Sequence, residues 1–274
     1  MKLNRKPFLA QGVLAVVYIS TVAIALACTL DFAAAQAQND VARGDRDAFL
    51  KGSTKDCPRC DLRDQELQRR DLSGADLRGA DLSYALLHRA DLRNARLDGA
   101  ILFGANLNKT IVRQASLVGA DLTNTLFFEA DLAGASLEGA KIVQSRLQYA
   151  RLNQTNMRGV DMNGSLLRST NLTGANLSGA NLQRSNFEEA LLRRANLSKA
   201  SLHGAAFEKA KLNDADLSGV SALQVDFLGA DMTNADLSNA DMRGCRFALA
   251  RMEGVKREGL NLSGSILPDG READ

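Results

Sequence analysis

The residues best suited to chemistry are two cysteines near residue 60. Cys57 and Cys60 form a Cys-Pro-Arg-Cys motif, a spacing found in thiol–disulfide exchange centres and in zinc sites. A zinc site needs further ligands, and the sequence holds neither a second CxxC motif nor a histidine cluster. In an oxidising compartment the pair would form a structural disulfide. A thiol redox role is the alternative.

The remaining chemical groups do not combine into a site. His88 and His203 are the only histidines and lie far apart in the sequence. Cys245 is isolated, which is typical of a buried free thiol. The aspartates recur at regular intervals, without the spacing of a calcium-binding loop. We therefore expect no catalytic residue, no cofactor and no metal.

A five-residue repeat must position these groups, because it fills the chain after Cys57. From Leu62 to Met252 every fifth residue is large and apolar, with Ala222 the one exception among 39 positions. We call these the central residues. From Ala75 to Ala250 a small residue, usually Ala, stands two positions before each central residue, and Asp or Asn usually stands directly before.

This period excludes a simple helix or strand. Five residues advance a helix by about 140° and place successive strand side chains on opposite faces, so neither would bury every central residue. A chain that bends after each short extended segment would point all of them inward. Glycines two positions after the central residue, such as Gly74 and Gly79, favour a tight turn there. The repeat predicts an all-β solenoid with periodic turns.

Exceptions to the Asp/Asn position indicate the length of one coil. They occur at intervals of 40 residues, a multiple of 20 but not of 15, at Leu86, Leu126, Leu166, Ala206 and Arg246. We predict coils of 20 residues with four faces, which place residues 20 apart side by side at about 4.8 Å. Opposite charges would then stack and favour this register, as in Asp131 with Arg151, Asp226 with Arg246 and Asp231 with Arg251.

The N-terminus has the features of an export signal. Lys2, Arg5 and Lys6 precede an uncharged apolar stretch that ends near Leu30, and Ala35-Gln36-Ala37 matches a cleavage site. We predict a signal peptide over 1–37. An uncleaved membrane anchor is the alternative, because the uncharged stretch is long enough to span a bilayer.

The ends of the repeat predict the domain boundaries. Residues 38–56 are expected to hold a linker and a short cap helix whose Phe49 and Leu50 cover the first coil. About ten coils would occupy 57–252. Arg257 stands where a central residue belongs, so we expect the coils to close near Met252 and 253–274 to form a C-terminal cap or tail. Leu262 and Leu267 suggest a partial extra coil there.

The repeat resembles the pentapeptide-repeat family, as in Ala75-Asp76-Leu77-Arg78-Gly79 and Ala175-Asn176-Leu177-Ser178-Gly179. The resemblance covers residues 60–252 and implies a right-handed quadrilateral β-helix. The leader, the segment 56–62 and the ending 266–270 look like those of exported cyanobacterial members from the thylakoid lumen or periplasm. For chemistry the resemblance implies almost nothing.

An apolar stripe is the one surface feature that indicates a binding role. It comprises Leu86, Leu126 and Leu166, with Phe128 beside Leu126 and Tyr149 near Leu166. We predict a non-enzymatic exported structural or protein-binding module that docks an unknown protein partner there. A DNA mimic that protects topoisomerases is a weaker alternative, because it needs a strongly anionic face and the chain has a formal charge of +2. We expect no nucleic-acid partner, and membrane contact only through an uncleaved N-terminal segment.

Overall fold

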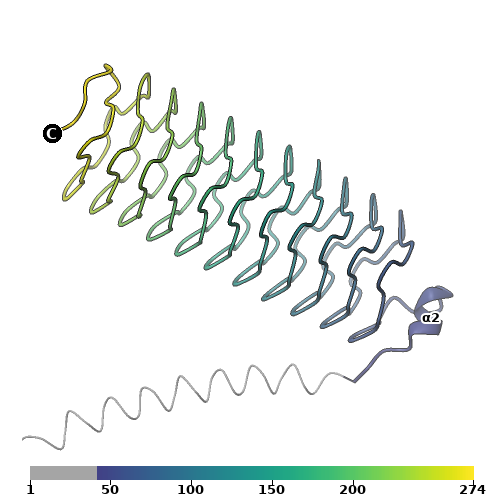
Figure 1. Cartoon of the computed structure of the whole chain (residues 1–274). Helices are drawn as coiled ribbons and strands as arrows, with labels where there is room; N and C mark the ends of the chain where they lie inside the picture. Colours follow the sequence, from purple (N-terminus) through teal and green to yellow (C-terminus); the bar gives the residue numbers. More distant parts are fainter. Residues whose placement is uncertain (1–41) are drawn as a thin grey trace, which may run out of the picture. The chain divides into compact units, whose positions relative to one another are not determined.

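The computed structural model describes residues 42–274, which wind into stacked coils (Figure 1). The predicted signal peptide over 1–37 lies outside the described residues. Across 42–274, no helix has the length and apolar character needed to cross a membrane.

Backbone pairing sets the coil length at 20 residues. Isolated parallel β-bridges join each residue that precedes a central residue to the residue 20 positions later, from Asp61 with Asp81 to Arg246 with Ile266. The amide of Leu62 donates to Asp81 O at 2.7 Å, and the amide of Asp81 donates back to Cys60 O at 2.9 Å. The predicted 20-residue register is confirmed. The chain forms a β-helix built from such single-residue bridges. No strand of several residues occurs within 42–274.

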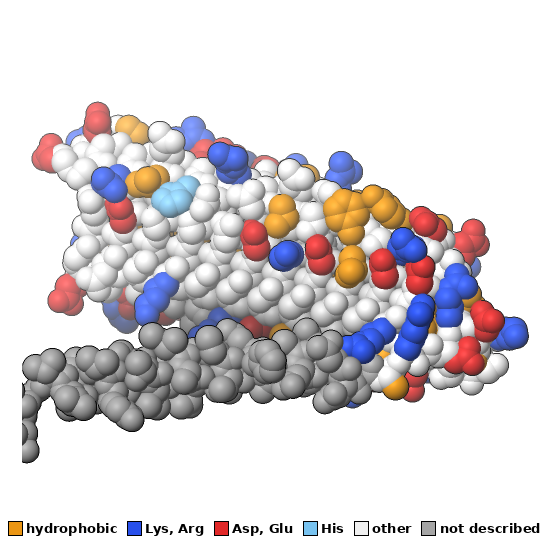
Figure 2. Space-filling view, turned by 60° about the horizontal axis from the view of Figure 1, so that its bottom comes forward, with side chains coloured by type: hydrophobic (Ala, Val, Ile, Leu, Met, Phe, Trp, Pro, Cys, Tyr) orange, Lys and Arg blue, Asp and Glu red, His pale blue; other side chains and the backbone are white. Residues whose placement is uncertain are grey.

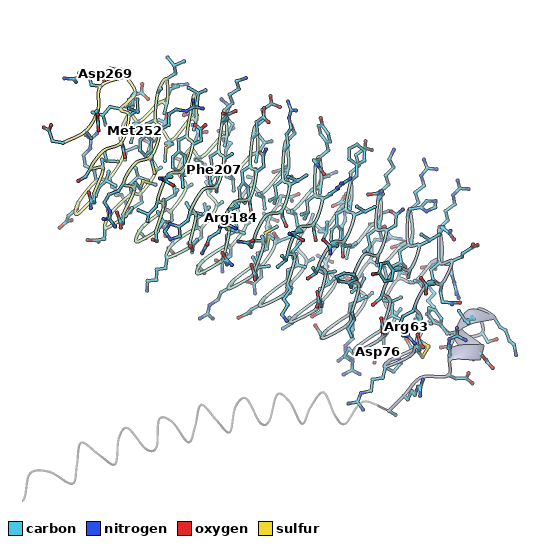
Figure 3. All side chains as sticks on the ribbon, viewed as in Figure 1. Arg63, Asp76, Arg184, Phe207, Met252 and Asp269 are labelled. Carbon is cyan, nitrogen blue, oxygen red and sulfur yellow. A yellow bond between two sulfur atoms is a disulfide. The ribbon has the colours of Figure 1, made fainter. Side chains whose placement is uncertain are left out.

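The central and small residues together form the core. Every central residue from Leu62 to Phe247 is buried, including the exceptional Ala222. One column of the core carries stacked phenylalanine rings, with centroids 4.7 to 5.3 Å apart, at Phe187, Phe207, Phe227 and Phe247. Figure 3 labels Phe207 within the coils. The five-residue repeat predicts that the central residues are buried. The stacking of the rings follows from the 20-residue coil, which places these four phenylalanines in one column.

The turns hold one residue of every repeat in the left-handed region. The small residue that ends each turn commonly donates its amide to the central residue, as Ala75 does to Leu72 O at 3.1 Å. The residue before it has a positive φ, as a type II turn requires. Gly119 (φ 64°) adopts this conformation without strain, whereas Tyr84 (φ 59°) and Leu249 (φ 60°) adopt it with a bulky side chain.

One short helix, α2 (Arg46–Leu50), precedes the coils. Asp45 caps it, its side chain accepting from the Ala48 amide at 3.0 Å. Phe49 is fully buried, and Arg70 donates to Phe49 O at 2.6 Å. The helix lies within 38–56, the segment expected to hold a linker and a short cap helix, and the Asp45 cap fixes where it begins.

The coils continue past Met252, beyond the boundary that we predicted. Bridges join Asp236 to Lys256 and Arg246 to Ile266, and Ile266 then pairs antiparallel with Glu272. Arg257 is exposed at a central position without ending the pairing. Backbone hydrogen bonds therefore hold the last coil together with Met252, Leu260 and Leu262, which are partly buried against the core.

Candidate functional site

The Cys57–Cys60 pair forms a covered disulfide at the start of the coils. The two sulfur atoms are bonded, the Cα atoms lie 5.4 Å apart and both residues are buried. In Figure 3 the yellow bond lies at the end of the coils next to α2. Gly44 donates to Pro58 O at 2.7 Å, and a Cβ at Gly44 would come within 2.6 Å of Cys57 Cα. The backbone at Gly44 therefore packs directly against Cys57, and the disulfide is buried.

Cys245 is the buried free thiol that the sequence predicts. Its Sγ donates to Ala222 O at 2.8 Å, and its amide donates to Ser265 Oγ at 3.0 Å. Burial raises the pKa of the thiol to about 11. A group that stays protonated at neutral pH is a poor nucleophile and a poor metal ligand.

The two histidines serve separate local roles. His203 accepts from the Leu223 amide at 3.2 Å and lies 3.2 Å from Ser221 Oγ. His88 lines a different surface hollow with Arg89 and Lys109. Within the described part of the chain, no three His, Cys, Asp or Glu residues are grouped to hold a metal ion.

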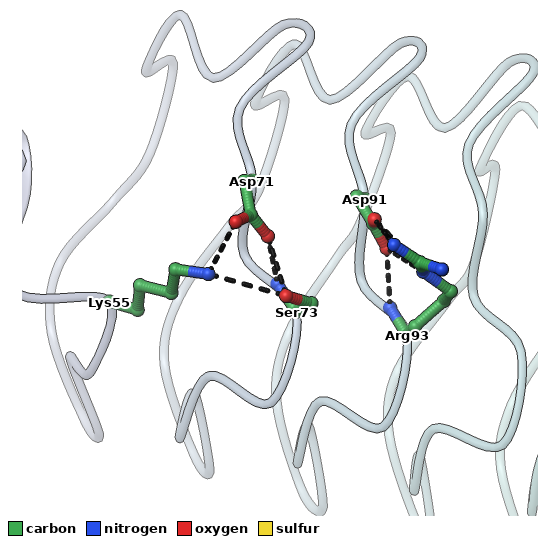
Figure 4. A network of polar contacts seen from close by, with 5 residues as sticks. All are labelled: Lys55, Asp71, Ser73, Asp91 and Arg93. Atoms are coloured by element: carbon green, nitrogen blue, oxygen red, sulfur yellow. Dashed lines mark hydrogen bonds and ion pairs between the residues drawn. The ribbon is translucent and has the colours of Figure 1, made fainter.

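Most aspartates before a central residue fix their own turns. Asp71 accepts from the Ser73 amide at 3.0 Å and from Lys55 Nζ at 2.6 Å, and Arg93 Nε donates to Asp91 at 2.9 Å (Figure 4). Hydrogen bonds from Lys55 and Ser73 hold the pKa of Asp71 well below its usual range. These carboxylates are ionised turn acceptors, which favours a structural role over acid–base chemistry.

Each face of a coil has a shallow trough between two rows of outward side chains. The central residue points inward, so only the residues directly before and after it rise from the face. Identical positions on successive coils are about 4.8 Å apart, so a trough runs along the stack. The residues at these two positions, together with turn residues at the edge of the face, line the hollows along a trough.

The apolar stripe lies along such a trough but is interrupted. The pairing order places Asn106 and Arg146 between its three leucines, Leu86, Leu126 and Leu166. The stripe is therefore a row of alternating apolar and polar side chains rather than a continuous apolar surface. Its apolar residues gather only where aromatic rings join them.

Leu126, Phe128 and Tyr149 meet in one hollow of about 410 Å³, which we call the aromatic hollow. The Phe128 and Tyr149 rings pack edge to face with centroids 5.5 Å apart. Both stay accessible, with exposed fractions of 38% and 52%. Asn108 Oδ1 accepts from the Phe128 amide at 2.8 Å and fixes the backbone beneath the ring. Figure 2 shows apolar side chains gathered among charged ones on the viewed face.

Two arginines give the aromatic hollow a basic rim that the sequence reasoning missed. Arg146 and Arg168 line it, and Arg168 lies 3.6 Å from both Glu188 and Glu189. Arg146 makes no ion pair within 4.0 Å among residues 42–274. Reading each face column by column at 20-residue steps would have found this rim. Leu86 and Leu166 do not line the hollow.

Comparisons with known proteins identify the repeat. A sequence profile for pentapeptide repeats matches eight copies, over residues 71–108, 112–142, 145–184, 175–214, 210–247 and 230–267. A comparison with curated protein sequences found no match.

Solved structures include similar chains. HetL, a pentapeptide repeat protein involved in heterocyst differentiation regulation from the cyanobacterium Nostoc sp. strain PCC 7120, is 30% identical. The match covers 82% of this chain and 96% of HetL, with a TM-score of 0.57. A pentapeptide repeat protein from the Arabidopsis thaliana thylakoid lumen is 26% identical over 45% of this chain and 69% of its own, with a TM-score of 0.24.

QnrB1, a plasmid-mediated fluoroquinolone resistance protein, is 16% identical over 73% of this chain and 87% of its own, with a TM-score of 0.39. The repeat profile spans most of the coils, and the match to HetL extends over nearly all of HetL. The chain therefore belongs to the pentapeptide-repeat protein family.

Proposed function

We propose that the chain is a non-catalytic, exported module that binds a partner protein at the aromatic hollow. The observation that carries this proposal is the exposed Phe128–Tyr149 pair, whose Phe128 backbone is held by a hydrogen bond to Asn108. Aromatic side chains held in place before binding lose little entropy on association and are enriched at the centres of protein interfaces. The leader over 1–37 supports export to the thylakoid lumen or periplasm.

The lining of the aromatic hollow favours a partner segment that carries both an apolar side chain and a carboxylate. An apolar side chain of the partner would enter between Leu126, Phe128 and Tyr149, and a neighbouring carboxylate would meet the guanidinium of Arg146. The DNA-mimic alternative lacks support, because mimicry of DNA needs a dense anionic row, whereas the chain is close to neutral and two arginines line this hollow. The thiol alternative is disfavoured by the burial of Cys57 and Cys60.

The test compares two double variants of the tagged mature protein. Leu126→Glu with Phe128→Glu places charge in the aromatic hollow. Val143→Glu with Leu223→Glu is the matched control, because these residues are half-buried like Leu126, lie on another face and have no carboxylate 20 residues before or after them. All four side chains point outward, so both variants should retain the coils, which far-UV circular dichroism checks.

We expect a partner purified from the export compartment to bind the wild type and the control equally, and to lose at least about tenfold in affinity for the hollow variant. Titration of the purified partner gives these affinities. If both variants weaken binding alike, or if no stoichiometric partner is recovered with the wild type, the proposal is wrong.

A further inference from the structure

A second trough, on the face that follows the aromatic hollow along the chain, is strongly basic. Its hollow of about 640 Å³ is lined by Thr173, Leu191, Arg193, Arg194, Lys211, Asn213 and Asp231. We call it the basic trough. Leu191, Lys211 and Asp231 are successive members of one paired column. Thr173, Arg193 and Asn213 occupy the opposite row at the same 20-residue steps.

The three cations of the basic trough lack ionic partners. Arg193, Arg194 and Lys211 make no ion pair within 4.0 Å and no side-chain hydrogen bond with any described residue. Many other basic residues of the coils are paired, such as Arg113 with Asp131 at 2.6 Å. Three unpaired cations around one hollow therefore form a local concentration of positive charge in a chain that is close to neutral overall.

The one carboxylate of the trough is already engaged. Asp231 is buried, accepts from Thr233 Oγ1 at 2.7 Å and lies 3.6 Å from Arg251. These partners offset its charge and leave the charge of the three cations available. Leu191 contributes an apolar surface beside them, with 40% of its area exposed.

We infer that the basic trough binds an acidic peptide segment in an extended conformation. Three successive coils give the trough a length of about 10 Å, which matches three extended residues. Guanidinium groups bind carboxylates with two parallel hydrogen bonds, and Lys211 adds a point charge. A nucleic acid would need a longer row of cations to neutralise successive phosphates.

The test measures binding of a fluorescein-labelled acidic octapeptide of Glu and Leu by fluorescence anisotropy at physiological ionic strength. The trough variant carries Arg193→Gln, Arg194→Gln and Lys211→Gln. Gln occupies the turn position of Arg194 elsewhere, as at Gln114 and Gln144, so the fold should persist. The control variant, with an equal charge change, carries Arg96→Gln, Lys141→Gln and Arg184→Gln, all exposed and outside the trough.

We expect the trough variant to bind the peptide at least about tenfold more weakly and the control variant to lose less than about twofold. The Leu126→Glu, Phe128→Glu variant should bind as the wild type does, which separates this site from the aromatic hollow. Equal losses in the two charge variants would mean general attraction and would overturn the inference. So would an absence of binding to the wild type, or displacement of the peptide by a DNA duplex as readily as by unlabelled peptide.

Discussion

The position of a residue within the repeat decides its chemistry. A cysteine at the small position, Cys245, is enclosed and donates to Ala222 O. Leu249 stands directly before Ala250, which occupies the same small position of the repeat. It is the most exposed large apolar residue described, at 76%. One step along the chain thus separates core from solvent.

Cys245 should not react in the folded protein. Its pKa is raised to about 11 by burial, so almost no thiolate is present at neutral pH. We expect iodoacetamide to leave the peptide containing Cys245 unmodified under native conditions and to alkylate it in denaturant. Mass spectrometry of the digested protein measures this. Rapid native alkylation would show that the last coils open readily.

Turn residues offer a direct test of strain. Leu249 has a φ of 60°, a conformation that costs a residue with a side chain about 1 kcal/mol relative to glycine. We expect Leu249→Gly to raise the free energy of unfolding by about that amount. Gly119→Ala should lower it similarly, since an added Cβ there meets nothing within 4 Å and only the φ is unfavourable. Denaturant titration compares both with the wild type.

At the scale of the element, one core column is built differently from its neighbours. Phe187, Phe207, Phe227 and Phe247 stack along a single face, with rings 4° to 19° from parallel. Most of the other central positions hold leucine or methionine. The stack favours the observed register of the coils. If one coil were shifted by five residues against the next, the phenylalanines would lie on different faces and their rings would no longer stack.

Phe207 lies inside this stack and is fully buried. We expect Phe207→Ala to lower the free energy of unfolding by about 3–5 kcal/mol, because the vacated volume lies between two rings. Phe207→Leu should cost less than about 1.5 kcal/mol, since leucine fills the same position in other coils. Phe128→Ala, at an exposed site, is the control and should change little. Equal effects at both sites would contradict the assigned core.

The aspartate columns should make stability depend on pH. Hydrogen bonds from Ser238, and then from Lys256, lower the pKa of Asp236 from 3.8 to about 2. The folded chain therefore binds this proton less tightly than the unfolded chain. The stabilisation is complete above pH 3.8 and is lost as the pH falls through about 2.

We expect the free energy of unfolding to fall between pH 4 and pH 2, and Asp236→Asn to flatten part of that slope. Asn196 lies in the same column as Asp236, and its Oδ1 accepts from the Ser198 amide at 2.9 Å. An asparagine at position 236 should therefore keep the hydrogen bond from the Ser238 amide. Denaturant titrations across this range decide the matter. An unchanged slope in the variant would show that other carboxylates dominate.

At the scale of the whole molecule, stability is a sum over neighbouring coils. Removal of residues 208–227 deletes one complete circuit and leaves Phe207 directly beside Phe247. Removal of residues 210–214 keeps the five-residue period but moves every later residue to the next face. We expect the smaller deletion to lower the Tm more than the larger one, as measured by circular dichroism. A higher Tm for the smaller deletion would show that the identity of the faces does not matter.

The coil length could be predicted from the sequence alone. Leu86, Leu126 and Leu166 lie in one column of the structure, so their spacing of 40 residues is a whole number of 20-residue coils. It placed the main end of the coils near Met252 and only a partial extra coil beyond, because it judged closure by the central side chain, whereas pairing to Lys256 and Ile266 is made by the backbone. The start of α2 depends on the single cap at Asp45. The basic trough escaped notice because its cations are close only when residues 20 apart are compared.

The constant register has a consequence for the distance between the two hollows. Each coil returns the chain to the same face and advances it by about 4.8 Å. Duplication of one 20-residue unit between them would move them apart by that single step and leave both linings unchanged. Insertion of whole 20-residue units would therefore change the separation of the two proposed binding sites in fixed steps of about 4.8 Å, which a flexible linker cannot provide.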